Sequence, residues 1–130
     1  MEKYPNDVKL VIKHFPLSSH KFAKPAAVAA LAAHQQGKFW EFHAKLFQNY
    51  RALDEQKVQE IATELELDME KFTADRNLPE INALIERDIR NGKAIGVRGT
   101  PTIFLNGKRV KNRSMQGFQQ LIEAEISKAE

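Results

Sequence analysis

The stretch that decides the fold is Gly96-Val97-Arg98-Gly99-Thr100-Pro101-Thr102-Ile103-Phe104, followed by Leu105-Asn106-Gly107-Lys108. Gly96 is expected to stop a helix, and Gly99 to free the backbone before Thr100-Pro101 opens a short apolar strand. The Asn106-Gly107 pair then predicts a tight turn that brings the strand back. Proline has no N–H, and an X-Pro bond can be cis at a cost of about 0.5–1 kcal/mol. The strand therefore begins at a bend whose rim another extended chain could pair with.

Spacing alone leaves a second interpretation of this stretch open. The residues around Pro101 could form an ordinary turn between a helix and a hairpin, with no binding role. Other segments of the sequence are needed to distinguish an ordinary turn from a binding site for an extended chain.

Length and composition favour a single globular domain. The chain has 130 residues, of which 42% are hydrophobic and 28% charged, with a formal net charge of +3. The local basic cluster at residues 108–113 is short and has no interleaved aromatics, so we expect a solvated hairpin there and no nucleic-acid site. No apolar run approaches the roughly 20 residues that span a bilayer, and the first residues show no signal peptide.

Cysteine is absent from the sequence. Disulfides, thiolate nucleophiles and cysteine-ligated metals are therefore excluded within these 130 residues. The four histidines, at positions 14, 20, 34 and 43, follow no compact zinc-ligand spacing, and His43 lies on an apolar helical face that favours a packing role. We expect no catalytic residue, no metal and no cofactor in this chain.

Hydrophobic periodicity predicts the order strand, helical block, strand, strand, helix. Residues 8–15 are apolar and β-branched and predict a buried strand. Five helices follow, from a Ser18 or Ser19 cap to Ile95, and the second of them is expected to carry much of the aromatic core. Strands at 102–105 and 109–111 then precede an amphipathic terminal helix.

Several of these segments together resemble the DsbA-like thiol-disulfide oxidoreductases of the thioredoxin superfamily. They are Tyr4-Pro5-Asn6-Asp7-Val8, Phe15-Pro16-Leu17 with His20, the Ala-rich helix, Gln36-Gly37-Lys38-Phe39-Trp40-Glu41-Phe42-His43, and Gly96-Val97 through Asn106-Gly107. The resemblance implies an α/β, thioredoxin-like fold, with thioredoxin parts at about 1–17 and 95–130 and a helical insertion at about 18–94. It also implies a cis-proline loop of Arg98, Gly99, Thr100 and Pro101, which binds an extended peptide or protein substrate.

The resemblance breaks at the amino terminus. Family members begin with a strand, a Cys-x-x-C motif and a helix, and all of these would precede Met1. We therefore expect a truncated thioredoxin-like fold with three strands remaining. The absent strand would lie between residues 8–15 and 102–105, so its loss exposes two edges of unpaired backbone groups. Self-association, or direct pairing of the two edges, would satisfy them.

Two classes of function follow. By kinship the chain is a DsbA-family thiol-disulfide oxidoreductase, which forms or isomerises protein disulfides, although the chain itself is expected to be redox-inactive because it has no cysteine. Alternatively, it is a non-catalytic peptide-binding or self-assembling module of thioredoxin-like fold. Family members usually act outside the cytoplasm, whereas this sequence directs no export, so the compartment stays open. No nucleic-acid or membrane partner is expected.

Overall fold

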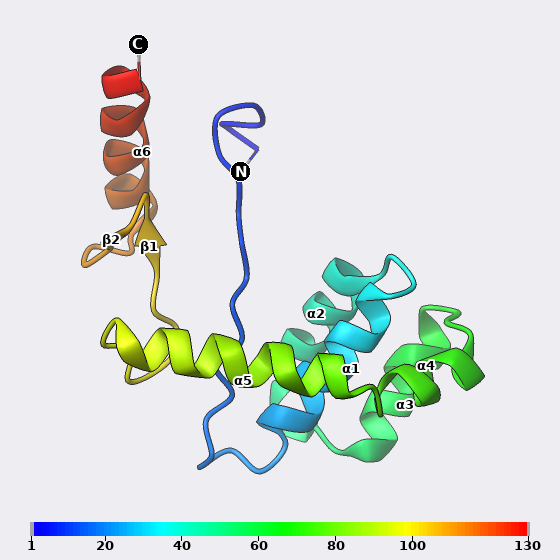
Figure 1. Ribbon diagram of the computed structural model, residues 1–130. Helices are drawn as coiled ribbons and strands as arrows, with labels where there is room; N and C mark the ends of the chain where they lie inside the picture. The colour runs from blue at the N-terminus through cyan, green and yellow to red at the C-terminus, as the bar shows by residue number, and fades with distance from the viewer. Residues whose placement is uncertain (1, 130) are drawn as a thin grey trace. The chain divides into compact units, whose positions relative to one another are not determined.

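The computed structural model describes residues 2–129, which form six α-helices, one short 3-10 helix and one hairpin (Figure 1). The elements are α1 (Ala23–His34), α2 (Phe39–Gln48), η1 (Tyr50–Ala52), α3 (Glu55–Glu64), α4 (Met69–Asp75), α5 (Pro79–Ala94), β1 (Phe104–Leu105), β2 (Lys108–Arg109) and α6 (Met115–Ala129). They divide into two compact units. The helical unit is His14–Gly96, and the hairpin unit combines the residues up to Lys13 with those from Val97 onward.

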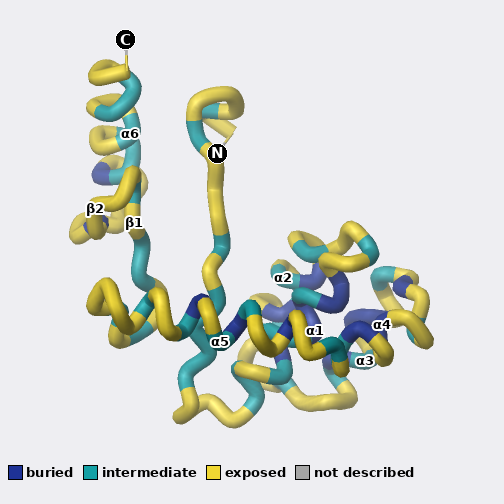
Figure 2. Tube along the Cα trace, viewed as in Figure 1, coloured by how far each residue is buried: buried dark blue, intermediate teal, exposed yellow. Residues whose placement is uncertain are grey.

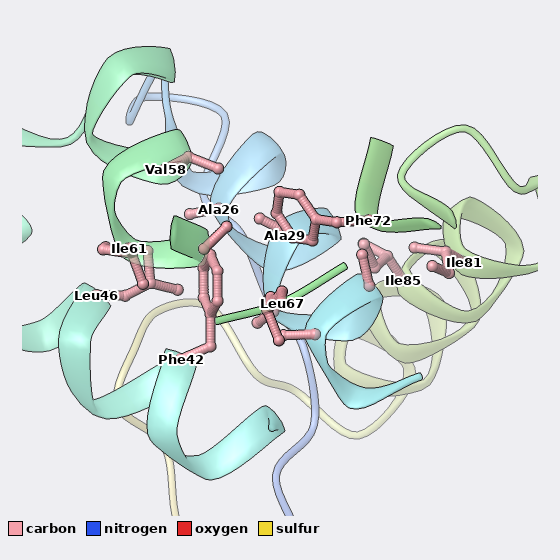
Figure 3. Close-up of a cluster of buried hydrophobic side chains, with 14 residues drawn as sticks. Ala26, Ala29, Phe42, Leu46, Val58, Ile61, Leu67, Phe72, Ile81 and Ile85 are labelled. Carbon is pink, nitrogen blue, oxygen red and sulfur yellow. The ribbon is translucent and has the colours of Figure 1, made fainter. Parts of the chain in front are cut away.

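The helical unit packs around α1. One face of α1 consists of small alanine side chains, which lets α2, α4 and α5 approach closely. Ala29, Ala32 and Ala33 on this face are 0% exposed. Phe42 of α2 and Phe72 of α4 fill the centre with ring centroids 5.8 Å apart (Figure 3). Burial is concentrated in these packed helices, as Figure 2 shows. This unit is therefore held by one hydrophobic core.

Local signals set the helix boundaries in the helical unit. Asp54 and Asp68 cap α3 and α4, each accepting a backbone N–H three residues on, from Lys57 at 2.7 Å and Lys71 at 3.1 Å. An aspartate directly before a run of helical spacing predicts such a cap, and the structure contains both caps. The Ser18 or Ser19 cap is wrong, because α1 begins after Phe22, which provides no side-chain cap.

The hairpin unit contains a two-stranded sheet and α6. Phe104 pairs with Arg109 and Leu105 with Lys108 in antiparallel register. The turn residues Asn106 and Gly107 have φ of 47° and 82°, the positive values that a tight two-residue hairpin turn requires. The predicted turn is confirmed, although both strands are shorter than expected.

The expected third strand is absent from the structure of residues 2–129. Residues 8–15 belong to no strand, and the sheet consists of β1 and β2 alone. A strand needs a hydrogen-bonding neighbour, and neither β1 nor another described segment pairs with residues 8–15. The prediction that residues 8–15 and 102–105 pair directly with each other is therefore also wrong.

The aromatic positions of α2 are less buried than their periodicity predicts. Phe42 is fully buried, whereas Trp40 is 49% and Phe47 66% exposed. The aromatic residues of α2 spread over a wider part of the helix surface than the part that the neighbouring helices contact. Only the aromatic residues on the contacted part therefore reach the core. The second helix thus contributes Phe42 to the centre of the core and Phe39 to its border, while Trp40 and Phe47 lie largely outside it.

Candidate functional site

The candidate site is the loop of residues 98–101, which leads from the helical unit into β1. The Thr100–Pro101 peptide bond is cis. The Thr102 hydroxyl donates to the Gly99 carbonyl oxygen at 2.7 Å, and the Arg113 guanidinium donates to the Pro101 carbonyl oxygen at 2.9 Å. Two hydrogen bonds therefore fix the backbone on both sides of Thr100.

Thr100 itself is open. Its side chain is exposed, as are those of Arg98 and Pro101, and its backbone N–H and C=O have no hydrogen-bond partner within residues 2–129. A fixed loop that presents one unpaired amide and one unpaired carbonyl can form a short β-bridge with an extended chain. Arg98 adds an exposed cation beside it.

The conformation of Gly99 differs from the one expected. Its φ lies outside the positive range that favours glycine, and a Cβ added there would meet no heavy atom within 4 Å. The positive φ values in this region belong to Gly96, at 87°, and to the turn residues Asn106 and Gly107. The backbone freedom predicted at Gly99 is therefore not used in the structure.

Arg113 was missed by sequence reasoning. It belongs to the basic cluster that the sequence predicts to be a solvated hairpin, and in the structure its guanidinium reaches back 12 residues to Pro101. No spacing rule connects the two positions, because the contact depends on the path of the chain after β2.

A second group of candidate side chains surrounds Phe39 in the helical unit. Its ring lies 6.1 Å from those of His14 and His34 and 5.5 Å from that of His43. Burial lowers the pKa of His43, and it is also the main cause that lowers the pKa of His14, against the opposing charge of Asp88. The stacking of the His43 ring on the Phe39 ring fits the packing role predicted for His43.

Clusters of metal ligands and cysteine thiols are the groups that metal binding and thiol exchange would use. Within residues 2–129, no group of three or more histidine, aspartate or glutamate side chains is arranged to hold a metal ion. The sequence contains no cysteine. No helix among the described residues has the length and apolar character needed to cross a membrane.

Comparison with known proteins gives the family. A family model described as thioredoxin matches residues 1–124. The crystal structure of a thioredoxin-like oxidoreductase from Silicibacter pomeroyi DSS-3 superposes with a TM-score of 0.73 at 30% identity, over 91% of this chain and 68% of that one. The chain therefore belongs to the thioredoxin-like family, with a mostly helical form of the fold and a small two-stranded sheet.

Longer proteins also contain a related segment. The chain is 35% identical over 108 residues to the Na(+)/H(+) antiporter NhaA of Herminiimonas arsenicoxydans, and 38% identical over 106 residues to Na(+)/H(+) antiporter NhaA 3 of Salinispora tropica. These matches cover 83% and 78% of this chain but only 17% and 16% of the antiporters. The chain thus spans about a sixth of the length of these relatives, whose names describe the whole proteins.

Proposed function

We propose that this chain is the substrate-binding part of a DsbA-type thiol-disulfide oxidoreductase domain. The observation that carries the proposal is the loop at Thr100, where one residue has a free backbone and exposed side chain between two neighbours whose carbonyls are already bonded. Membership of the thioredoxin-like family and the oxidoreductase neighbour give the redox context.

The loop would hold an extended segment of a protein substrate. The Thr100 N–H would donate to, and its carbonyl accept from, one residue of that segment, which needs no particular side chain. Main-chain pairing of this kind suits a domain that acts on many sequences. Arg113 would act as a positioning residue, since it fixes the carbonyl of Pro101 without facing the bound chain.

The chain by itself would carry out no thiol-disulfide exchange. Exchange begins with the attack of a thiolate on a disulfide sulfur, and no residue of this sequence can supply the thiolate. In an active protein of this type, the Cys-x-x-C motif would have to come from sequence outside these 130 residues. The helical unit would then correspond to an insertion within the thioredoxin fold.

The absence of cysteine also favours a second candidate, a non-catalytic peptide-binding or self-assembling module. The coding sequence upstream of Met1 distinguishes the two. An in-frame Cys-x-x-C supports the oxidoreductase, and an immediate in-frame stop codon supports the module.

Insulin reduction and peptide binding test the proposal on the purified chain. We expect no insulin reduction above the blank, and turnover above it would refute the inactive assignment. We expect the reduced and alkylated insulin B chain to bind, and Arg113→Ala to weaken binding several-fold. Lys111→Ala removes the same charge two residues away from an exposed side chain and should leave binding unchanged. Equal losses in the two variants would show that net charge, and not the loop, determines binding.

A further inference from the structure

The tripeptide Asn-Gly-Lys occurs twice in the sequence, and its two copies belong to different kinds of structure. Asn91-Gly92-Lys93 lies in α5, whereas Asn106-Gly107-Lys108 leads from β1 into β2 (Figure 1). In both copies the asparagine side chain is followed by a residue without a Cβ, so no side chain shields the next backbone nitrogen. The two copies thus share their local chemistry and differ in their surroundings.

An asparagine followed by glycine can lose ammonia through a cyclic imide. The backbone nitrogen of the glycine gives its proton to a base in the solvent and attacks the side-chain Cγ of the asparagine. A new C–N bond forms, the bond from Cγ to the side-chain nitrogen breaks, and ammonia leaves after that nitrogen takes a proton from water. A second water then opens the ring to aspartate or isoaspartate, so water is the only co-reactant and no electrons are exchanged.

The hairpin turn leaves the reacting groups of Asn106 and Gly107 accessible. Both residues are exposed, as is the turn that they form (Figure 2). Within residues 2–129, the Gly107 N–H donates to no acceptor, and a Cβ added to Gly107 would meet no heavy atom within 4 Å. Attack by this nitrogen on the Asn106 side chain therefore breaks no backbone hydrogen bond of the hairpin.

Helix α5 holds the other copy. Gly92 lies inside the helix, where its N–H donates to the carbonyl oxygen of Asp88, four residues back. The carbonyl oxygens of Asn91 and Gly92 both accept from the Ile95 N–H, at 3.3 and 3.2 Å. The nitrogen of Gly92 can attack the Asn91 side chain only after these bonds of the last turns open.

We propose that Asn106 is a deamidation site of the folded chain and that the α5 backbone protects Asn91 from the same reaction. The product has a carboxylate in the turn of the hairpin, either as aspartate or as isoaspartate. This modification is independent of the proposed peptide site, because it requires only the turn and water.

The modification would change how the hairpin is attached to α6. The Asn106 amide donates to the Glu125 carboxylate at 3.3 Å, and this hydrogen bond is the main cause that lowers the pKa of Glu125. An ionised carboxylate at position 106 cannot donate, and it places a second negative charge beside Glu125. Isoaspartate also adds one carbon to the main chain of a tight two-residue turn. Both products therefore loosen the contact between the turn and α6.

Peptide mapping by mass spectrometry, after incubation of the folded chain at mildly alkaline pH, tests the site. We expect Asn106 to be deamidated roughly ten times as fast as Asn91, a ratio that corresponds to about 1.4 kcal/mol of opening free energy in α5. In urea the two rates should become similar, because each asparagine precedes Gly-Lys. Labelling with an isoaspartyl methyltransferase identifies the isoaspartate product.

Two outcomes of this experiment would overturn the proposal. If Asn106 stays intact in the folded chain while both positions react in urea, the turn protects its asparagine. If both positions react at the same rate in the folded chain, the fold does not select between them.

Hydrogen exchange of the Asn106→Asp variant tests the effect on the hairpin unit. Its β1, β2 and α6 amides should exchange roughly three to ten times faster than in the wild type, as expected for the loss of one hydrogen bond. Asn91→Asp introduces the same charge at an exposed position of the helical unit and should leave these amides unchanged. Equal exchange in Asn106→Asp and the wild type would refute the proposed loosening.

Discussion

Asp88 of α5 binds the backbone at the start of the helical unit. Its replacement tests how much this contact contributes to the stability of the unit. The carboxylate is 4% exposed, and its Oδ2 accepts the backbone N–H of His14 at 3.0 Å. Its other oxygen, Oδ1, is buried without a hydrogen-bond partner and lies 3.6 Å from the Arg87 guanidinium. One bond thus connects positions 74 residues apart in the sequence.

We predict that Asp88→Ala destabilises the helical unit by about 1–3 kcal/mol, because it leaves the His14 N–H without its acceptor. Asp88→Asn keeps an oxygen acceptor for the His14 N–H, but this acceptor is weaker than a carboxylate, and the amide N–H₂ replaces an oxygen that has no hydrogen-bond partner. Its free energy of unfolding should therefore lie between those of the wild type and Asp88→Ala.

Urea denaturation followed by the fluorescence of Trp40 measures these differences, since the single tryptophan belongs to the same unit as Asp88. Arg87→Ala is the control, and should change stability by less than about 0.5 kcal/mol because its side chain is 53% exposed. If Asp88→Ala unfolds at the same urea concentration as the wild type, the bond to His14 does not hold the unit. If Arg87→Ala costs as much as Asp88→Ala, the ion pair is the contact that matters.

Three further predictions concern single contacts. The bidentate hydrogen bond from the Arg76 guanidinium lowers the pKa of Glu55 from 4.5 to about 2. The pair therefore contributes to the folding free energy above pH 4.5, and this contribution is lost as the pH falls towards 2. Since the Glu55 side chain is 56% exposed, we expect only about 1 kcal/mol, and Glu55→Gln should remove this part of the acid dependence in urea titrations. Gly117→Ala would place a Cβ 2.8 Å from the backbone oxygen of Asn112. In hydrogen-exchange measurements, the free energy of opening of the α6 amides should therefore fall by roughly 1–3 kcal/mol, whereas Gln116→Ala should leave it unchanged. Asp54→Ala removes the acceptor for the Lys57 N–H and should cost about 1 kcal/mol in urea unfolding, with Asp54→Asn nearly neutral.

Local chemistry made much of the helical unit predictable from sequence. The caps at Asp54 and Asp68 need only a side-chain oxygen three residues before an N–H, and both are present. The last of the five predicted helices was expected to end at Ile95, and α5 continues to Ala94. These features depend on neighbours within one turn of the chain.

Features that depend on distant partners were not predictable. Residues 8–15 have the composition of a strand, but a strand exists only where a neighbour pairs with it, and none of the described residues does. Phe47 has the periodicity of a core residue, yet the neighbouring helices leave it 66% exposed. At the candidate site, the loop at Thr100 was located from sequence, whereas its attachment to Arg113 depends on how the chain returns after β2.

An NMR titration of the ¹⁵N-labelled chain with the reduced and alkylated insulin B chain tests the proposed substrate site most directly. We predict that the Thr100 amide shows the largest chemical-shift change and becomes protected from solvent exchange, because its N–H gains a partner that it lacks in the free chain. Saturable binding that leaves the Thr100 amide unchanged, with shifts elsewhere on the molecule, would contradict the assignment of this loop as the peptide site.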